Sequence, residues 1–69
     1  MTIGEKIRVL IARKKMSVTA LASALGITRQ YLTAKLRNNN FTLAELERIA
    51  KIIGCEFSYE FTLQNGEKF

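Results

Sequence analysis

Apolar side chains recur at helical spacing in four segments of the chain. Within each segment most of them have a neighbour three or four residues away, which places them on one face of a helix. They are Ile3, Ile7, Leu10 and Ile11; Val18, Leu21, Ala22 and Leu25; Ile27, Leu32 and Leu36; and Leu43, Leu46, Ile49, Ala50 and Ile53. This pattern predicts four amphipathic helices, over residues 2–14, 18–25, 28–37 and 42–53.

Residues that begin and end helices support these boundaries. Thr2 and Thr42 are each followed three residues later by a glutamate, which is the spacing of a capping box. Ser17 and Thr28 are expected N-caps, because a hydroxyl can accept a hydrogen bond from a free amide of the first turn. Gly26 is placed to end the second helix with a left-handed backbone. Two helices joined by so short a corner must cross steeply, as in a helix-turn-helix motif.

After the fourth helix the hydrophobic pattern changes to a period of two. Apolar and polar residues alternate over residues 55–63, which is typical of a strand with one apolar face. The apolar positions are Cys55, Phe57, Tyr59, Phe61 and Leu63. A turn is expected over residues 64–66, which include Asn65-Gly66, and a short return strand over residues 67–69. The expected fold is mostly α, with a four-helix bundle and a C-terminal hairpin in one domain, residues 1–69.

Two registers are open to this hairpin. A two-residue loop pairs Thr62 with Phe69, whereas a three-residue loop ending in a left-handed Gly66 pairs Phe61 with Phe69. In either register the return strand is too short to cover the long one, and much of the strand edge is unpaired. Two arrangements follow. The long strand pairs with its copy in a homodimer, through its apolar positions, or the hairpin folds onto its own helices.

Composition excludes most kinds of chemistry. The chain of 69 residues has one cysteine, no histidine and no aspartate, so it lacks the residues of Ser/His/Asp, Cys/His and histidine-rich metal sites. We expect no enzyme activity, metal, cofactor or small-molecule substrate. Cys55 is expected to be a small buried hydrophobe in a reduced, cytoplasmic protein, with an intermolecular disulfide as the alternative. No signal peptide or membrane span is expected.

The net charge of +5 is divided unevenly along the chain. Residues 1–40 hold eight Lys and Arg residues and one Glu, whereas residues 41–69 hold three Lys and Arg residues and five Glu. Basic charge concentrated in the half that carries the helix-turn-helix pattern favours a polyanionic partner. A membrane surface fits less well, because these residues do not share a helix with a strong aromatic face.

The polar face of the third helix is formed by Gln30, Thr33, Ala34 and Arg37, with Arg29 on its rim near the N-terminus. Four of these side chains are suited to the edges of base pairs. Arg29 is suited to guanine and Gln30 to adenine, while Thr33 and Ala34 suit the methyl group of thymine. Most polar helix faces only meet water, so this stripe alone does not establish binding.

The run Leu21-Ala22-Ser23-Ala24-Leu25-Gly26-Ile27-Thr28 resembles the corner of the lambda-repressor-like, or Cro-type, helix-turn-helix family. The resemblance covers about residues 3–53 and depends on an alanine, a glycine and an apolar residue at fixed offsets. It implies an XRE-like transcriptional regulator that binds double-stranded DNA, with Arg29, Gln30, Thr33 and Ala34 at the bases. Family members commonly finish with another helix, so the expected strand is a departure.

The resemblance also implies contacts to the DNA backbone, which set the register without reading sequence. The residues assigned to these contacts are Lys14, Lys15, Thr28, Tyr31, Arg37 and Asn38. Some have structural alternatives. Lys14 and Lys15 end a helix, where cations are favoured. Asn38 begins a run of turn-forming residues, and Tyr31 is equally suited to packing at the helix rim.

Two other functions fit the sequence less well than a repressor-type regulator. An antitoxin-like interaction module would hold a protein partner through its strand edge or aromatic face, with DNA binding secondary. A reader of RNA ranks third, because the chain lacks the glycine and aromatic signatures of common single-strand readers.

Overall fold

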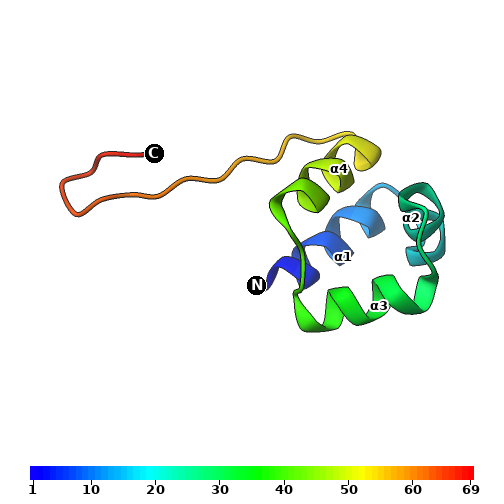
Figure 1. Cartoon of the computed structure of the whole chain (residues 1–69). Coiled ribbons are helices and arrows are strands. Elements are labelled where there is room, and N and C mark those ends of the chain that lie inside the picture. Colours follow the sequence, from blue (N-terminus) through cyan, green and yellow to red (C-terminus); the bar gives the residue numbers. More distant parts are fainter.

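The computed structural model describes all 69 residues and confirms that the chain is mostly helical, with four helices (Figure 1). They are α1 (Ile3–Arg13), α2 (Val18–Leu25), α3 (Arg29–Asn38) and α4 (Leu43–Ile53). Each end lies within one residue of the sequence-based expectation. None of the four helices combines the length and the apolar character that a membrane span requires.

A side-chain cap fixes the start of every helix. Thr2, Ser17, Thr28 and Thr42 have extended backbones, and each side chain accepts a hydrogen bond from the amide three residues later. In α1 and α4 the third helical residue is a glutamate. Its carboxylate accepts a hydrogen bond from the amide of the capping threonine, at 3.0 Å in α1 and 2.8 Å in α4. Both predicted capping boxes are therefore confirmed.

The corner between α2 and α3 is built around Gly26. This residue has a φ of 74°, a left-handed conformation that glycine adopts at little cost. The Gly26 amide donates to the Ser23 carbonyl at 3.1 Å, and the Ile27 amide donates to the Ala22 carbonyl at 3.0 Å. These two bonds form a Schellman motif, which ends α2 and leaves Thr28 free to cap α3.

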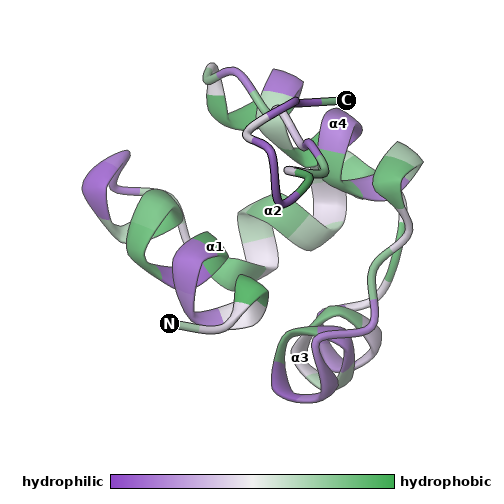
Figure 2. Ribbon diagram, turned by 90° about the vertical axis from the view of Figure 1, so that its left-hand side faces the viewer, coloured by the Kyte–Doolittle hydropathy of each residue, from purple (hydrophilic) through white to green (hydrophobic).

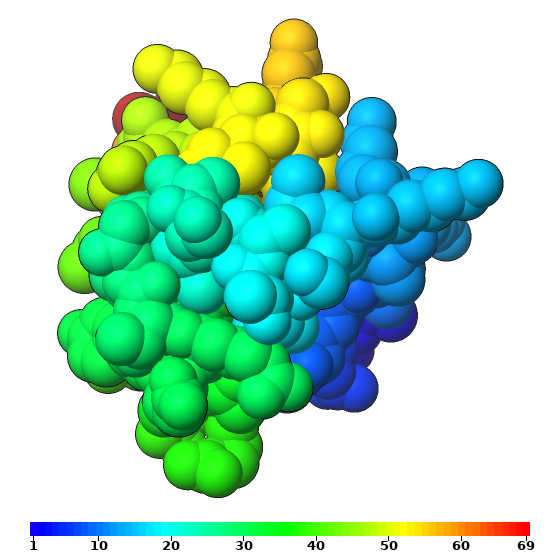
Figure 3. All heavy atoms as spheres, turned by 90° about the vertical axis from the view of Figure 1, so that its right-hand side faces the viewer, coloured from blue at the N-terminus to red at the C-terminus, as the bar shows by residue number.

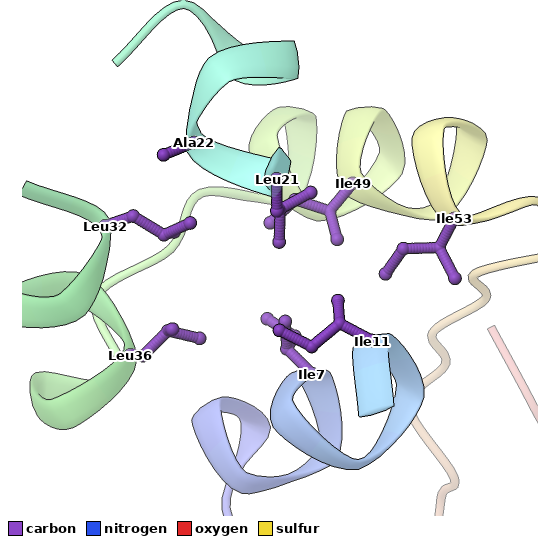
Figure 4. Packing of buried hydrophobic residues seen from close by; sticks show 8 residues of the cluster. All are labelled: Ile7, Ile11, Leu21, Ala22, Leu32, Leu36, Ile49 and Ile53. Atoms are coloured by element: carbon purple, nitrogen blue, oxygen red, sulfur yellow. The ribbon is translucent and has the colours of Figure 1, made fainter. Parts of the chain in front are cut away.

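One apolar cluster holds the four helices together (Figure 4). Each helix contributes two of its eight residues: Ile7 and Ile11, Leu21 and Ala22, Leu32 and Leu36, and Ile49 and Ile53. Leu21 of α2 and Leu32 of α3 have no exposed surface. Full burial of one such side chain stabilises a fold by about 1.5–3 kcal/mol, so loss of any one weakens a core this small.

The helices place α3 at one side of the molecule. It packs on α1 and α2, and in Figures 1 and 2 it lies lowest while α4 lies highest. The outer side of α3 is therefore covered by no other part of the chain.

The C-terminal segment, residues 55–69, is extended, but the predicted strand over residues 55–63 is absent. From Glu56 to Glu60 no backbone group is hydrogen-bonded to another backbone group. The segment projects away from the helices (Figure 1), and the radius of gyration is 13.4 Å against about 11 Å for a compact chain of this length. The alternation was present, but a strand needs a neighbour for its backbone groups, and the return is too short to provide one.

The tip of the segment folds back in a tight turn. Phe61 and Phe69 exchange both backbone hydrogen bonds, at 2.7 and 2.8 Å, and Gly66 has a φ of 92°. This is the pairing of the three-residue loop. Thr62 lies opposite Lys68 in a single antiparallel bridge, which excludes its pairing with Phe69.

Most apolar side chains of the segment find no cover on their own helices. The exposed fractions are 59% for Tyr59, 78% for Phe61, 46% for Leu63 and 70% for Phe69. Only Phe57 is half-buried, at the edge of an apolar groove of about 280 Å³ between α1 and α4. The arrangement with the hairpin folded onto its own helices is not the one observed.

The prediction that Cys55 is buried was wrong, because Cys55 is exposed to solvent. Left-handed Gly54, with a φ of 86°, ends α4 and turns the chain outward at this point. Cys55 therefore lies at the base of the projecting segment instead of in the core.

A salt bridge joins α3 to the start of α4. The ammonium of Lys35 lies 2.9 Å from Oε2 of Glu45 and donates to the Asn40 carbonyl at 3.0 Å. The carboxylate of Glu45 also accepts the amide hydrogen of Thr42. This backbone bond, and then the bond with Lys35, hold the pKa of Glu45 below its usual range.

Replacing Glu45 by glutamine is expected to flatten the acid side of the stability profile. A lowered folded pKa means that ionised Glu45 stabilises the fold above about pH 4.3, and that this contribution is lost as the pH falls through the folded pKa. Glutamine keeps the capping bond but does not titrate. Urea unfolding, between about pH 2.5 and pH 6, measures the free energy of unfolding.

The same substitution at Glu47, which is exposed and has no ionic partner, controls for the loss of a negative charge. An acid-side slope in Glu45→Gln as steep as that of the unmodified chain would show that this carboxylate does not contribute to acid sensitivity.

Candidate nucleic-acid interface

Two leucines attach α3 to the domain and determine which of its faces stays free. Leu32 and Leu36 are one turn apart and both are buried against α1 and α2. The Thr28 hydroxyl accepts the Tyr31 amide at 3.1 Å and starts the helix. The side of α3 turned away from the leucines faces solvent, and Figure 2 shows that many residues of α3 are hydrophilic.

This outward side, the open face of α3, carries the five residues of the predicted stripe. Arg29, Gln30 and Arg37 are exposed, whereas Thr33 and Ala34 are half-buried. The long polar side chains are therefore accessible to solvent, and the two short side chains between them are less accessible. Neither arginine has a carboxylate at ion-pair distance.

Lys14 and Lys15, which lie between α1 and α2, are also exposed and have no ionic partner. Figure 3 shows this connection, in light blue, reaching into solvent beside α2. Lys15 has a φ of 55°. The Lys15 amide donates to Ala12 and the Met16 amide to Ile11, so Lys15 occupies the left-handed position of a Schellman motif, where glycine is usual. The residue identity gave no sign of this conformation.

The other predicted backbone contacts lie along α3. Thr28 is exposed but its hydroxyl already caps the helix. Tyr31 is 55% exposed, with the Lys35 ammonium 5.2 Å from its ring centre. Asn38 is the last residue within α3, before the C-cap Asn39, and is exposed.

Two residues near this surface are committed to other contacts, which the sequence analysis missed. Lys35 belongs to α3, but its side chain is only 11% exposed and is held by Glu45 and by the ring of Phe41, 5.5 Å away. Asn39 ends α3 in a left-handed conformation, and its side-chain oxygen accepts the Gly4 amide at 2.8 Å. Glutamate in the next helix cap was the available signal for the first. The Gly4 pairing spans 35 residues, and no residue near Asn39 pointed to it; a glycine in the first turn of α1 was the only sign of a close approach.

The basic half of the chain is almost free of ion pairs. Of the eight Lys and Arg residues in residues 1–40, only Lys35 has a carboxylate partner. Seven cations therefore remain uncompensated in the part of the molecule that contains α1, α2 and α3. An electrostatic surface of this kind attracts phosphate groups and concentrates polyanions near it.

Comparison with known proteins agrees with this geometry. A family model for the Cro/C1-type HTH DNA-binding domain matches residues 6–58. No match to a curated protein sequence or to a solved structure was found. The matched stretch contains the whole of α2, α3 and α4 and more than three-quarters of the chain. The chain, with its Gly26 corner and its open α3, belongs to the Cro/C1-type helix-turn-helix DNA-binding domain family.

Proposed function

We propose that the protein regulates transcription by binding operator DNA sequence-specifically through α3. One observation carries this proposal: the open face of α3 is covered by no other element and lies in the half of the domain whose cations, apart from Lys35, have no carboxylate partner. In helix-turn-helix proteins the second helix of the motif enters the major groove. Repression needs only that the operator be occupied, and it is the simplest outcome of such binding.

Sequence would be read near the start of α3. Arg29 has the fork geometry to bond guanine O6 and N7, and Gln30 can bond adenine N6 and N7. Both side chains are exposed. Thr33 and Ala34 lie lower on the same face, where short apolar groups suit the methyl of thymine.

Backbone contacts would come from both sides of α3. Lys14 and Lys15 lie in the connection before α2, Thr28 and Tyr31 lie at the start of α3, and Arg37 and Asn38 lie at its end. The backbone of Lys15 supports this assignment. A cation in a left-handed conformation, which glycine adopts at lower cost, is a local strain of the kind found at functional sites.

We further propose a homodimer in which Cys55 to Leu63 pair with the same residues of a second copy. The unbonded backbone from Glu56 to Glu60 and the exposed aromatic side chains support this proposal. Antiparallel pairing across a two-fold axis would satisfy one edge of each segment and cover apolar surface. In Figure 1 the segment runs sideways from the top while α3 lies along the bottom, so a vertical two-fold axis through the segment would turn both α3 helices to one side.

Such a dimer would suit two half-sites on one duplex. Successive major grooves on one side of DNA are about 34–36 Å apart, and the operator would then be a palindrome. The exposed segment also favours a second candidate, an antitoxin-like module that binds a different protein. Neutral behaviour on DNA columns, or co-purification with a fixed protein partner, would favour that alternative.

Base preference tests the assignment of α3. Arg29→Ala and Gln30→Ala are each expected to lose about 1–3 kcal/mol of discrimination between a selected site and its single-base variants, since bidentate contacts are removed. Fluorescence anisotropy titrations on such a panel measure this loss. If both variants kept full discrimination, α3 would not be the reading helix.

Lys15→Gly provides the contrast on the same panel. It is expected to weaken binding to every sequence alike, because only a phosphate contact is lost. The fold is expected to be at least as stable, because glycine relieves the left-handed backbone. Weaker binding with an intact fold separates the functional role of this lysine from a structural one.

Ser58→Pro tests the proposed dimer. Proline removes an amide in the middle of the unpaired stretch, so sedimentation equilibrium should show monomers while circular dichroism keeps its helical signal. Gln64→Pro is the matched control. The Gln64 amide makes no backbone hydrogen bond. Gln64 is the second residue of the turn that is closed by the bond from the Gly66 amide to the Leu63 carbonyl, and proline is favoured at that position. A dimer that persisted in Ser58→Pro would rule out assembly through this segment.

A further inference from the structure

The far end of α3 is fastened to the beginning of α1 by one polar contact. Oδ1 of Asn39 accepts the amide hydrogen of Gly4 at 2.8 Å, in a partly buried position. These residues are 35 apart, whereas every other side-chain hydrogen bond apart from the Lys35–Glu45 ion pair joins residues at most five apart. This contact is therefore the only such bond that ties distant helices together.

The backbones of α1 and α3 also meet closely at this point. Gly4 is buried, and a Cβ added to it would overlap the carbonyl oxygen of Leu36. A Cβ would also lie 2.9 Å from Oδ1 of Asn39. Only glycine lets the two helices approach to this distance.

Asn39 performs two tasks at once. Its φ of 54° and ψ of 38° end α3, and its own amide donates to the Lys35 carbonyl. Its side chain meanwhile satisfies one of the amides that the first turn of α1 cannot satisfy within the helix. Asparagine combines a tolerance for the left-handed backbone with a side-chain acceptor, which glycine at this position would lack.

We infer that Asn39 and Gly4 are positioning residues for DNA recognition, because they set the angle at which α3 is presented. This inference rests on the proposed reading of bases by α3. A ten-residue helix is about 15 Å long, so a tilt of about 10° displaces one end relative to the other by about 2.6 Å. Specific contacts require placement to about 0.5 Å. Phosphate contacts by flexible cations tolerate a shift that bidentate base contacts do not.

The test is the ratio of affinities for a selected operator and for unrelated duplex DNA, measured at a temperature at which circular dichroism shows a folded chain. Asn39→Gly keeps a residue that favours the left-handed backbone but removes the acceptor. It is expected to lower this ratio by about tenfold or more, with binding to unrelated DNA changed by less than about twofold, since that binding depends on phosphates.

Two variants serve as controls. Asn39→Asp keeps an acceptor and is expected to keep the ratio, although its charge lowers both affinities. Asn40→Gly makes the same substitution one residue later, where the side chain forms no hydrogen bond, and is expected to keep the ratio. Asn39→Gln moves the acceptor by one methylene with a smaller change in volume. Asn39→Gln should lower the ratio of affinities as Asn39→Gly does. If the glycine variant unfolds, Asn39→Gln alone tests the positioning role.

The outcomes separate this inference from the function on which it rests. An unmodified protein that showed no preference for any sequence would overturn both. A preference that survived in folded Asn39→Gly and Asn39→Gln, with the unmodified protein selective, would overturn the positioning role alone.

Discussion

The structure depends on holding α3 from one side only. The outer face of α3 is open, so its attachment falls to Leu32 and Leu36, which are buried on α1 and α2. The core that receives them has only eight residues. Two polar contacts to other helices complete the attachment: Lys35 is paired with Glu45 at the start of α4, and Asn39 accepts the Gly4 amide of α1. Each of these few contacts fixes the position of the whole helix.

The features of the fold that depend on local chemistry were predictable. Hydroxyl and glutamate spacing fixed the starts of α1 and α4, and Gly26 fixed the corner, because caps and left-handed turns are specified by neighbouring residues. Alternation at residues 55–63 correctly indicated an extended chain, but a strand depends on a partner that sequence spacing does not reveal. The exposure of Cys55 was missed for the same reason, since burial depends on where the segment goes after Gly54.

In the candidate site too, features that depend on local sequence were predictable and contacts with other helices were not. Periodicity was enough to place Arg29 and Gln30 on an exposed face. It did not show that Lys35 is held by Glu45, or that Asn39 binds Gly4, because these partners come from other helices. One signal was available and unused: glycine in a first helical turn costs stability, and its presence at position 4 marks a close approach of two backbones. The structure shows an open face of α3 in the half of the chain whose cations, apart from Lys35, have no carboxylate partner.

The salt dependence of DNA binding tests the central claim, that this basic side of the domain binds duplex DNA through its phosphates. Affinity for duplex DNA is measured at several salt concentrations and plotted on logarithmic axes. Three cations at the proposed backbone contacts, Lys14, Lys15 and Arg37, predict a slope of about −2.7 for each bound protomer, because each neutralised phosphate contributes about −0.9. A slope near zero would contradict the account.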